Sequence, residues 1–248
     1  MTAEGIEFTN FDRVVVSVEP AALGEINSPS DLTGVRYSAE FGLDQQTRIR
    51  RAVIRNDNQP SHLANLDSET KLAMQHLNFM LESLKSGDTA TSRRHAEHAH
   101  NIIVGEQDAR FGDLDGNGRV ENPSATGTGI LVFHGSLAAE LRDIAENPLL
   151  LSPRSQFYAS EVVPLTMANQ RAQLEQVLTL NERAAEQNDI DQAIPLAEQS
   201  IAELVAVLAG KDLDENGVID AKQGESGILG FQNLLHLLTD RTFRVEPD

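Results

Sequence analysis

Residues 113–121 read DLDGNGRVE, and residues 212–220 read DLDENGVID. Both stretches carry Asp, Asp and Asn at loop positions 1, 3 and 5, and Gly at position 6. An EF-hand calcium loop has this spacing, because calcium takes about six to eight oxygen ligands and glycine permits the sharp turn between them. The alternative is a turn without an ion, since Asp, Asn and Gly favour turns in general. Two matching stretches in one chain favour calcium, and we expect two sites.

The EF-hand pattern assigns each loop a set of oxygen ligands, with a backbone carbonyl at position 7. In the first loop they are Asp113, Asp115, Asn117, Arg119 (by its carbonyl) and Glu121; in the second they are Asp212, Asp214, Asn216, Val218 (by its carbonyl) and Asp220. Position 12 departs from the pattern, because Ser124 and Gln223 replace the usual bidentate Glu. We expect Glu225 to substitute in the second loop, and binding to be weaker than in a sensor EF-hand.

Position 8 is apolar in both loops, with Val120 in the first and Ile219 in the second. Apolar residues at this position let two calcium loops pair as a short β-ribbon. The sequence therefore predicts that the two loops face each other, with Val120 beside Ile219.

The chain around the loops repeats as well. Two stretches with apolar residues at helical spacing precede each loop, and they turn at Gly87-Asp88 in one half and at Asn188-Asp189 in the other. The tripeptide Gly-Ile-Leu and a further helical stretch follow each loop. This order predicts a mainly α protein with duplicated units, each a helical hairpin, a calcium loop and a helix. The expected units are residues 44–150 and 151–248.

Residues 1–43 predict a small N-terminal β segment. Residues 13–18 read RVVVSV, and apolar residues alternate with polar ones over 35–41, as in half-buried strands. Two strands alone are marginally stable in water. The segment is therefore expected either to pack on other parts of the chain or to be the end of a larger β domain.

The charge of the chain excludes some partners. It is −18, from 20 basic and 38 acidic residues, so nucleic acid and anionic membrane surfaces are not expected partners, whereas cations are. There is no cysteine for a disulfide or a thiolate metal site, and no apolar run approaches the roughly 20 residues of a membrane span. No nucleotide-binding fingerprint and no nucleophile with an adjacent base is recognisable, so we do not expect an enzyme.

Three histidines of the first unit are predicted to converge. A hairpin that turns at Gly87-Asp88 brings His76 opposite His98, and His95 lies one turn before His98 on the same helical face. Such a cluster has two interpretations. It is either a transition-metal site, since imidazole suits zinc, copper and iron, or a group of partly buried, hydrogen-bonded histidines, with a pH switch as a variant.

Two stretches resemble one protein family. The first is FDRVVVSVEP at 11–20 with Ser28-Pro29 and VRYS at 35–38; the second is HAEH at 95–98 with NIIVGE at 101–106 and FGDLDGNG at 111–118. The first resembles the closing strands of the extracytoplasmic domain of anti-sigma factors of the sigma-K-regulator type. The second resembles a helical module that follows this domain in some bacterial proteins. The resemblance implies an envelope-facing sensor region in which His95 and His98 are family features.

The sequence favours a calcium-binding helical module that senses a ligand or interacts with another protein, in the cell envelope or elsewhere outside the cytoplasm. The cytoplasm remains the alternative compartment. One alternative function is a His/carboxylate transition-metal-binding bundle, either a metal carrier or an oxidoreductase. A second is a dockerin-like adhesion module, because dockerins also pair two such loops.

Overall fold

The computed structural model describes residues 59–145 and 156–231, and it places the side chains of residues 60–143 and 156–231. It also describes the backbone of three short strand segments before residue 59 and of one after residue 243. The described part is mainly α. Most of the expected β segment of residues 1–43, and the residues after 231 in the helical stretch expected after the second loop, lie outside the described residues.

The strands form two small antiparallel pairings. Strand β1 (Arg13–Val18) pairs with β2 (Val35–Glu40), and β2 also pairs with the two-residue strand β5 (Arg244–Val245). Strands β3 (Arg55–Asn56) and β4 (Gln59–Pro60) pair separately, just before the first described helix.

The first helical hairpin consists of α2 (His62–Ser86) and α3 (Thr89–Val104). The hydroxyl of Ser61 accepts the Ala64 N–H at 3.1 Å and begins α2, and Gly87 ends it with a φ of 82°, a left-handed conformation that favours glycine. The carboxylate of Asp88 then accepts the Thr91 N–H at 3.0 Å and begins α3. The turn therefore lies at Gly87-Asp88, as the sequence predicts.

The second hairpin consists of α6 (Val163–Glu186) and α7 (Ile190–Ala209). A π-helical turn, η5 (Tyr158–Val162), leads directly into α6. Asp189 caps α7 by accepting the Asp191 N–H at 3.0 Å. The helical turns η6 (Ala221–Gln223) and η7 (Ile228–Gly230) follow the loop after α7.

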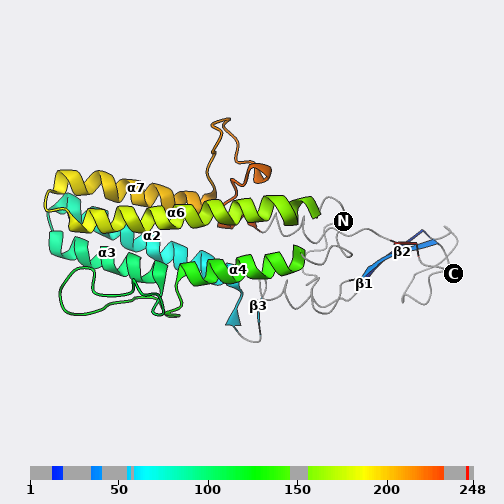
Figure 1. Ribbon diagram of the computed structural model, residues 1–248, viewed down its shortest axis with the longest axis horizontal. Helices are drawn as coiled ribbons and strands as arrows, with labels where there is room; N and C mark the ends of the chain where they lie inside the picture. Colours follow the sequence, from blue (N-terminus) through cyan, green and yellow to red (C-terminus); the bar gives the residue numbers. More distant parts are fainter. Residues whose placement is uncertain are drawn as a thin grey trace.

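The two hairpins form a four-helix bundle. Helix α2 packs against both α3 and α7, and α6 packs against the same two helices, so α3 and α7 lie diagonally across the bundle. Helix α4 (Ile130–Ala145) continues in the layer of α3 and packs against α2 and α6 (Figure 1). The loop that contains residues 113–121 thus lies between two consecutive helices of one layer.

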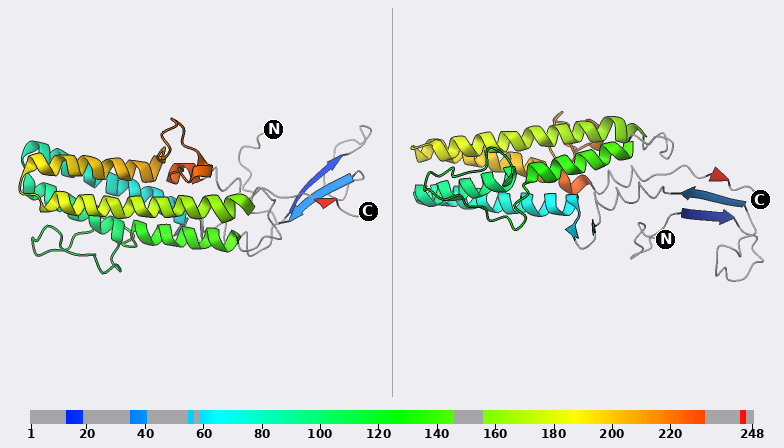
Figure 2. Two further views of the ribbon diagram at one scale, coloured as in Figure 1. Left: turned by 45° about the horizontal axis from the view of Figure 1, so that its top comes forward. Right: turned by 60° about the horizontal axis from the view of Figure 1, so that its bottom comes forward.

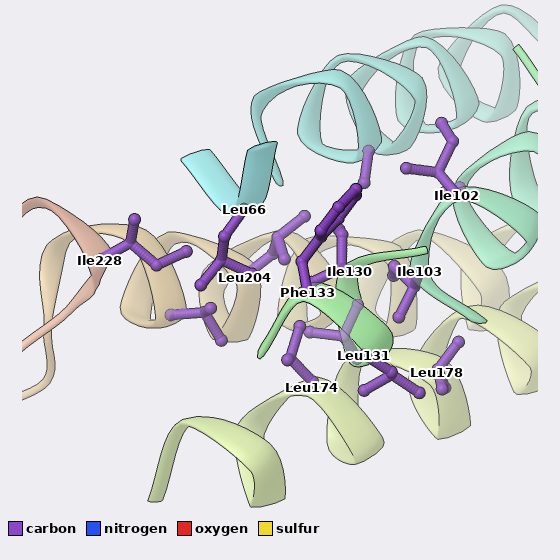
Figure 3. Close-up of a cluster of buried hydrophobic side chains, with 14 of the residues drawn as sticks. Leu66, Ile102, Ile103, Ile130, Leu131, Phe133, Leu174, Leu178, Leu204 and Ile228 are labelled. Carbon is purple, nitrogen blue, oxygen red and sulfur yellow. The ribbon is translucent and has the colours of Figure 1, made fainter. Parts of the chain in front are cut away.

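The core consists mainly of aliphatic side chains from every helix of the bundle. Along α2 the buried stripe is Leu66, Ala73, Leu77, Met80 and Leu84, at the spacing of one helical face. Figure 3 shows Ile130 and Phe133 of α4 among residues from the other helices, with Leu174 of α6 nearby. Ile130 and Ile228, the central residues of the two Gly-Ile-Leu tripeptides, are both buried and anchor the chain where it leaves each loop.

Candidate metal centres

The first loop folds around the side chains of two aspartates. The carboxylate of Asp113 accepts the backbone N–H groups of Asn117 at 3.0 Å and Gly118 at 2.8 Å, and the carboxylate of Asp115 accepts the Asn117 N–H at 2.9 Å. The side-chain oxygen of Asn117 accepts the Arg119 N–H. The loop is therefore closed around the oxygens at positions 1, 3 and 5.

A third carboxylate joins this loop from the preceding helix. Glu97 of α3 is completely buried, and its carboxylate accepts the backbone N–H of Asp115 at 3.2 Å and of Glu121 at 2.7 Å. Oxygens of Glu97, Asp113 and Asp115 lie within 4.8 Å of one another, and we call these residues the first carboxylate group. Sequence reasoning missed Glu97 because EF-hand ligands are sought within the loop and after it.

The second loop contains a matching set. The carboxylate of Asp212 accepts the N–H groups of Asn216 at 3.1 Å and of Gly217, and the Gly217 bond lowers the pKa of Asp212 below its usual value. Oxygens of Asp212, Asp214 and Glu225 lie within 4.8 Å of one another and form the second carboxylate group. Glu225, which the sequence predicts as a late ligand of this loop, is only 2% exposed.

Glu97 and Glu225 contact the same positions of their respective loops. Glu225 accepts the N–H groups of Asp214 at 3.3 Å and Asp220 at 2.7 Å, which are positions 3 and 9. Glu97 accepts the N–H groups of positions 3 and 9 in the first loop, Asp115 and Glu121. A buried carboxylate therefore occupies the same place in each loop, although it precedes the first loop in the chain and follows the second.

The remaining expected ligands lie on the loops but outside these groups. The carboxylate of Glu121 lies 3.1 Å from Nε2 of His98, and that of Asp220 accepts the Lys222 N–H at 2.8 Å, where it caps η6. Arg119 and Val218 donate their N–H groups to the position-5 asparagines Asn117 and Asn216.

The two loops do not face each other, and the predicted pairing of Val120 with Ile219 is wrong. The loops lie on different sides of the bundle (Figures 1 and 2), because they leave the diagonal helices α3 and α7. Val120 is 51% exposed and Ile219 is 47% exposed. Each loop closes on its own ends instead: Glu106 donates its N–H to the Gly127 carbonyl, and Lys211 donates to the Glu225 carbonyl.

The first loop runs back along α3, and four residues of that helix hold it. Asn101 is fully buried; its amide donates to the carbonyls of Gly112 and Glu121, and its side-chain oxygen accepts the Gly112 N–H. His100 bonds the Arg110 carbonyl through Nε2 at 3.0 Å. Together with Glu97 and His98, these contacts fix the loop over the last two turns of the helix.

The three histidines converge as the hairpin register predicts. Nδ1 of His76 lies 3.1 Å from Nδ1 of His95 and 3.3 Å from Nδ1 of His98. We call His76, His95 and His98 the histidine cluster. Burial, together with the neighbouring His98 and His95, lowers the pKa of His76 to about 4, and burial also lowers the pKa of His95. A lowered pKa favours the neutral form of both rings, which is the form that binds metals.

Comparison with known protein families, with curated proteins and with solved structures finds no match to this chain. In the part of the chain that the structure describes, no helix is long and apolar enough to cross a membrane.

Proposed function

We propose that this protein is a non-enzymatic calcium-binding module with one site in each loop. The observation that carries the proposal is the pair of carboxylate groups, each of which combines two loop aspartates with a buried glutamate. Sidechain and backbone oxygens gathered around a Gly-centred turn are the ligands that calcium prefers.

Electrostatics supports a cation at these positions. Three carboxylates within 4.8 Å repel one another, and burial of Glu97 and Glu225 raises the free energy of their charged forms. Backbone N–H groups offset part of this cost, and a bound divalent ion offsets more. Calcium suits these loops better than magnesium, which requires a nearly octahedral shell at about 2.0–2.1 Å and retains several waters.

Calcium titration of chelator-treated protein tests the proposal through the two buried glutamates. The wild type should bind two ions, and Glu97→Gln and Glu225→Gln should each bind one, because each change removes a charge from one carboxylate group. The matched control is Glu203→Gln on α7, whose carboxylate pairs with Lys211 and belongs to neither group; it should bind two ions.

A melting experiment supplies the second readout. Calcium that binds only the folded protein stabilises it by about 2.7 kcal/mol at 100 times the dissociation constant. Millimolar calcium should therefore raise Tm of the wild type and, by a smaller amount, of each glutamate variant. An unchanged Tm in the wild type would contradict calcium binding at either loop.

We propose further that the two halves arose by duplication and that the module works outside the cytoplasm, where it senses a ligand or binds another protein. The matching order of hairpin, loop and buried Ile supports the duplication. The resemblance to the extracytoplasmic region of anti-sigma factors supports the location, and millimolar extracellular calcium suits loops without a standard position-12 Glu. The loops lie apart, which removes the reason for the dockerin-like alternative.

A further inference from the structure

The contacts of the histidine cluster are difficult to explain by hydrogen bonding alone. An imidazole nitrogen has one position in the ring plane, which holds either a proton or a lone pair, so each nitrogen makes one good hydrogen bond. Nδ1 of His76 has two imidazole nitrogens at hydrogen-bonding distance, Nδ1 of His95 and Nδ1 of His98. It can satisfy only one of them, whereas a cation between the three rings would use all three lone pairs.

The spacing of the nitrogens agrees with a tetrahedral metal site. Zinc binds histidine nitrogen at about 2.0–2.1 Å, and two ligands of a tetrahedron at that length lie about 3.3–3.4 Å apart. Two of the three Nδ1–Nδ1 separations, from His76 to His95 and from His76 to His98, are 3.1 Å and 3.3 Å. The ring planes of His76 and His98 are 87° apart, so the two rings meet edge to face and are not stacked.

We propose that Nδ1 atoms of His76, His95 and His98 bind a transition-metal ion of the zinc type, with the fourth position open to water. This site is separate from the two proposed calcium sites. Three neutral nitrogens and no thiolate suit zinc, and they are poor ligands for calcium, which prefers oxygen.

The surroundings of the cluster orient one of its rings for this role. Glu121 lies 3.1 Å from Nε2 of His98 on the opposite side of the ring from the other histidines. When the Nε2–H group donates a hydrogen bond to this carboxylate, the lone pair of His98 is on Nδ1 and faces the cluster. A carboxylate on the outer nitrogen of a ligating histidine is the usual support in zinc sites, because it fixes the tautomer and raises ligand basicity.

An ion can reach the cluster from the surface. A hollow of about 490 Å³ borders His95 and is lined also by Phe79, Glu82, Ser83 and Ser86. His95 is therefore accessible from one side, whereas His76 is buried. The hollow gives room for the water that would complete a tetrahedral shell.

The test is zinc binding by the full chain in millimolar calcium, measured by competition with a chromophoric chelator. The wild type should bind one zinc ion tightly, and His95→Gln and His76→Gln should weaken that event by at least about 100-fold, since even supporting residues of such sites contribute about 10–100-fold. The matched control is His62→Gln, at the first residue of α2 and outside the cluster, and it should bind like the wild type. Equal zinc affinity in the wild type and in His95→Gln would overturn the proposal.

Cobalt provides a readout of geometry. Cobalt(II) in a tetrahedral site gives strong visible absorption, whereas six-coordinate cobalt gives weak absorption. We expect the strong spectrum in the wild type and in His62→Gln, and its loss in His95→Gln. Melting curves without added metal show which variants are folded. If the buried His76→Gln variant does not fold, the more exposed His95→Gln variant still provides the test. A weak six-coordinate spectrum in folded wild type would also overturn the proposal.

Discussion

At the scale of single residues, the carboxylate of Glu121, which is predicted as a calcium ligand, contacts the histidine cluster. Position 9 of a calcium loop often contacts the ion, either directly or through water. The Glu121 carboxylate instead lies beside His98 at 3.1 Å and 3.8 Å from the Arg94 guanidinium, while only its backbone N–H faces the first carboxylate group. Its side chain therefore contacts the histidine cluster, and its backbone contacts the first carboxylate group.

Glu121→Gln should accordingly weaken zinc binding by about 10–100-fold, because a neutral amide orients His98 less strongly than a carboxylate. Calcium affinity of the first loop should change much less than it does in Glu97→Gln. The chelator competition and the calcium titration measure the two effects on the same protein. A variant that lost calcium but kept its zinc affinity would show that Glu121 is a loop ligand after all.

The residues also show what a sequence can reveal. The aspartates, Glu225 and the convergence of the histidines follow from spacing, because a loop register and a hairpin register are local properties. Glu97 does not, since it lies 16 positions before Asp113 and reaches the loop only because the loop folds back along α3. The one available signal was the absence of a late carboxylate in the first loop, which implies that an acid is supplied from elsewhere.

At the scale of elements, the two loops attach differently to the helices before them. Asp212 follows closely after Gly210, which ends α7, whereas residues 106–112 separate Asp113 from Gly105, which ends α3. The longer segment before the first loop lets this loop lie along α3, where the buried amide of Asn101 donates to the carbonyls of Gly112 and Glu121. The sequence predicted the hairpins and loops, but not this attachment, which depends on tertiary contacts.

Asn101→Ala should lower the free energy of unfolding by about 3 kcal/mol, because it leaves the Gly112 N–H and two carbonyl groups without their partner in a partly buried setting. Urea unfolding with chelator measures the effect. Asn78→Ala is the matched control: Asn78 is exposed and its amide donates to the Met74 carbonyl four residues earlier, so the change should be within about 0.5 kcal/mol. Equal stability of the two variants would mean that the loop is not held through Asn101.

At the scale of the whole molecule, buried histidines make stability depend on pH. His134 of α4 is 4% exposed, and burial, with a further contribution from Arg171, lowers its pKa from 6.5 to about 4. The unfolded chain therefore takes up this proton at a higher pH than the folded chain does. His76, with a pKa of about 4, acts in the same direction.

The contribution of His134 to stability should be complete above pH 6.5 and should decrease as the pH falls toward 4, by up to about 3 kcal/mol. His134→Gln removes the titrating group, so its free energy of unfolding should vary less between pH 7 and pH 4 than that of the wild type. Urea titrations at several pH values, with chelator present, measure both slopes. Parallel slopes would show that His134 is not protonated differently in the two states.

The position of Glu121 between the two kinds of site has a thermodynamic consequence. Its backbone N–H donates to Glu97 of the first proposed calcium site, and its carboxylate lies at hydrogen-bonding distance from His98 of the histidine cluster. An ion that orders this residue at one site also prepares it for the other. By linkage, the factor by which calcium changes zinc affinity must equal the factor by which zinc changes calcium affinity. The second loop lies on another side of the bundle and has no residue in the place of Glu121 that contacts the histidine cluster. Its calcium affinity should therefore be insensitive to zinc. The second loop would thus serve as an internal control for the effect of zinc on the first.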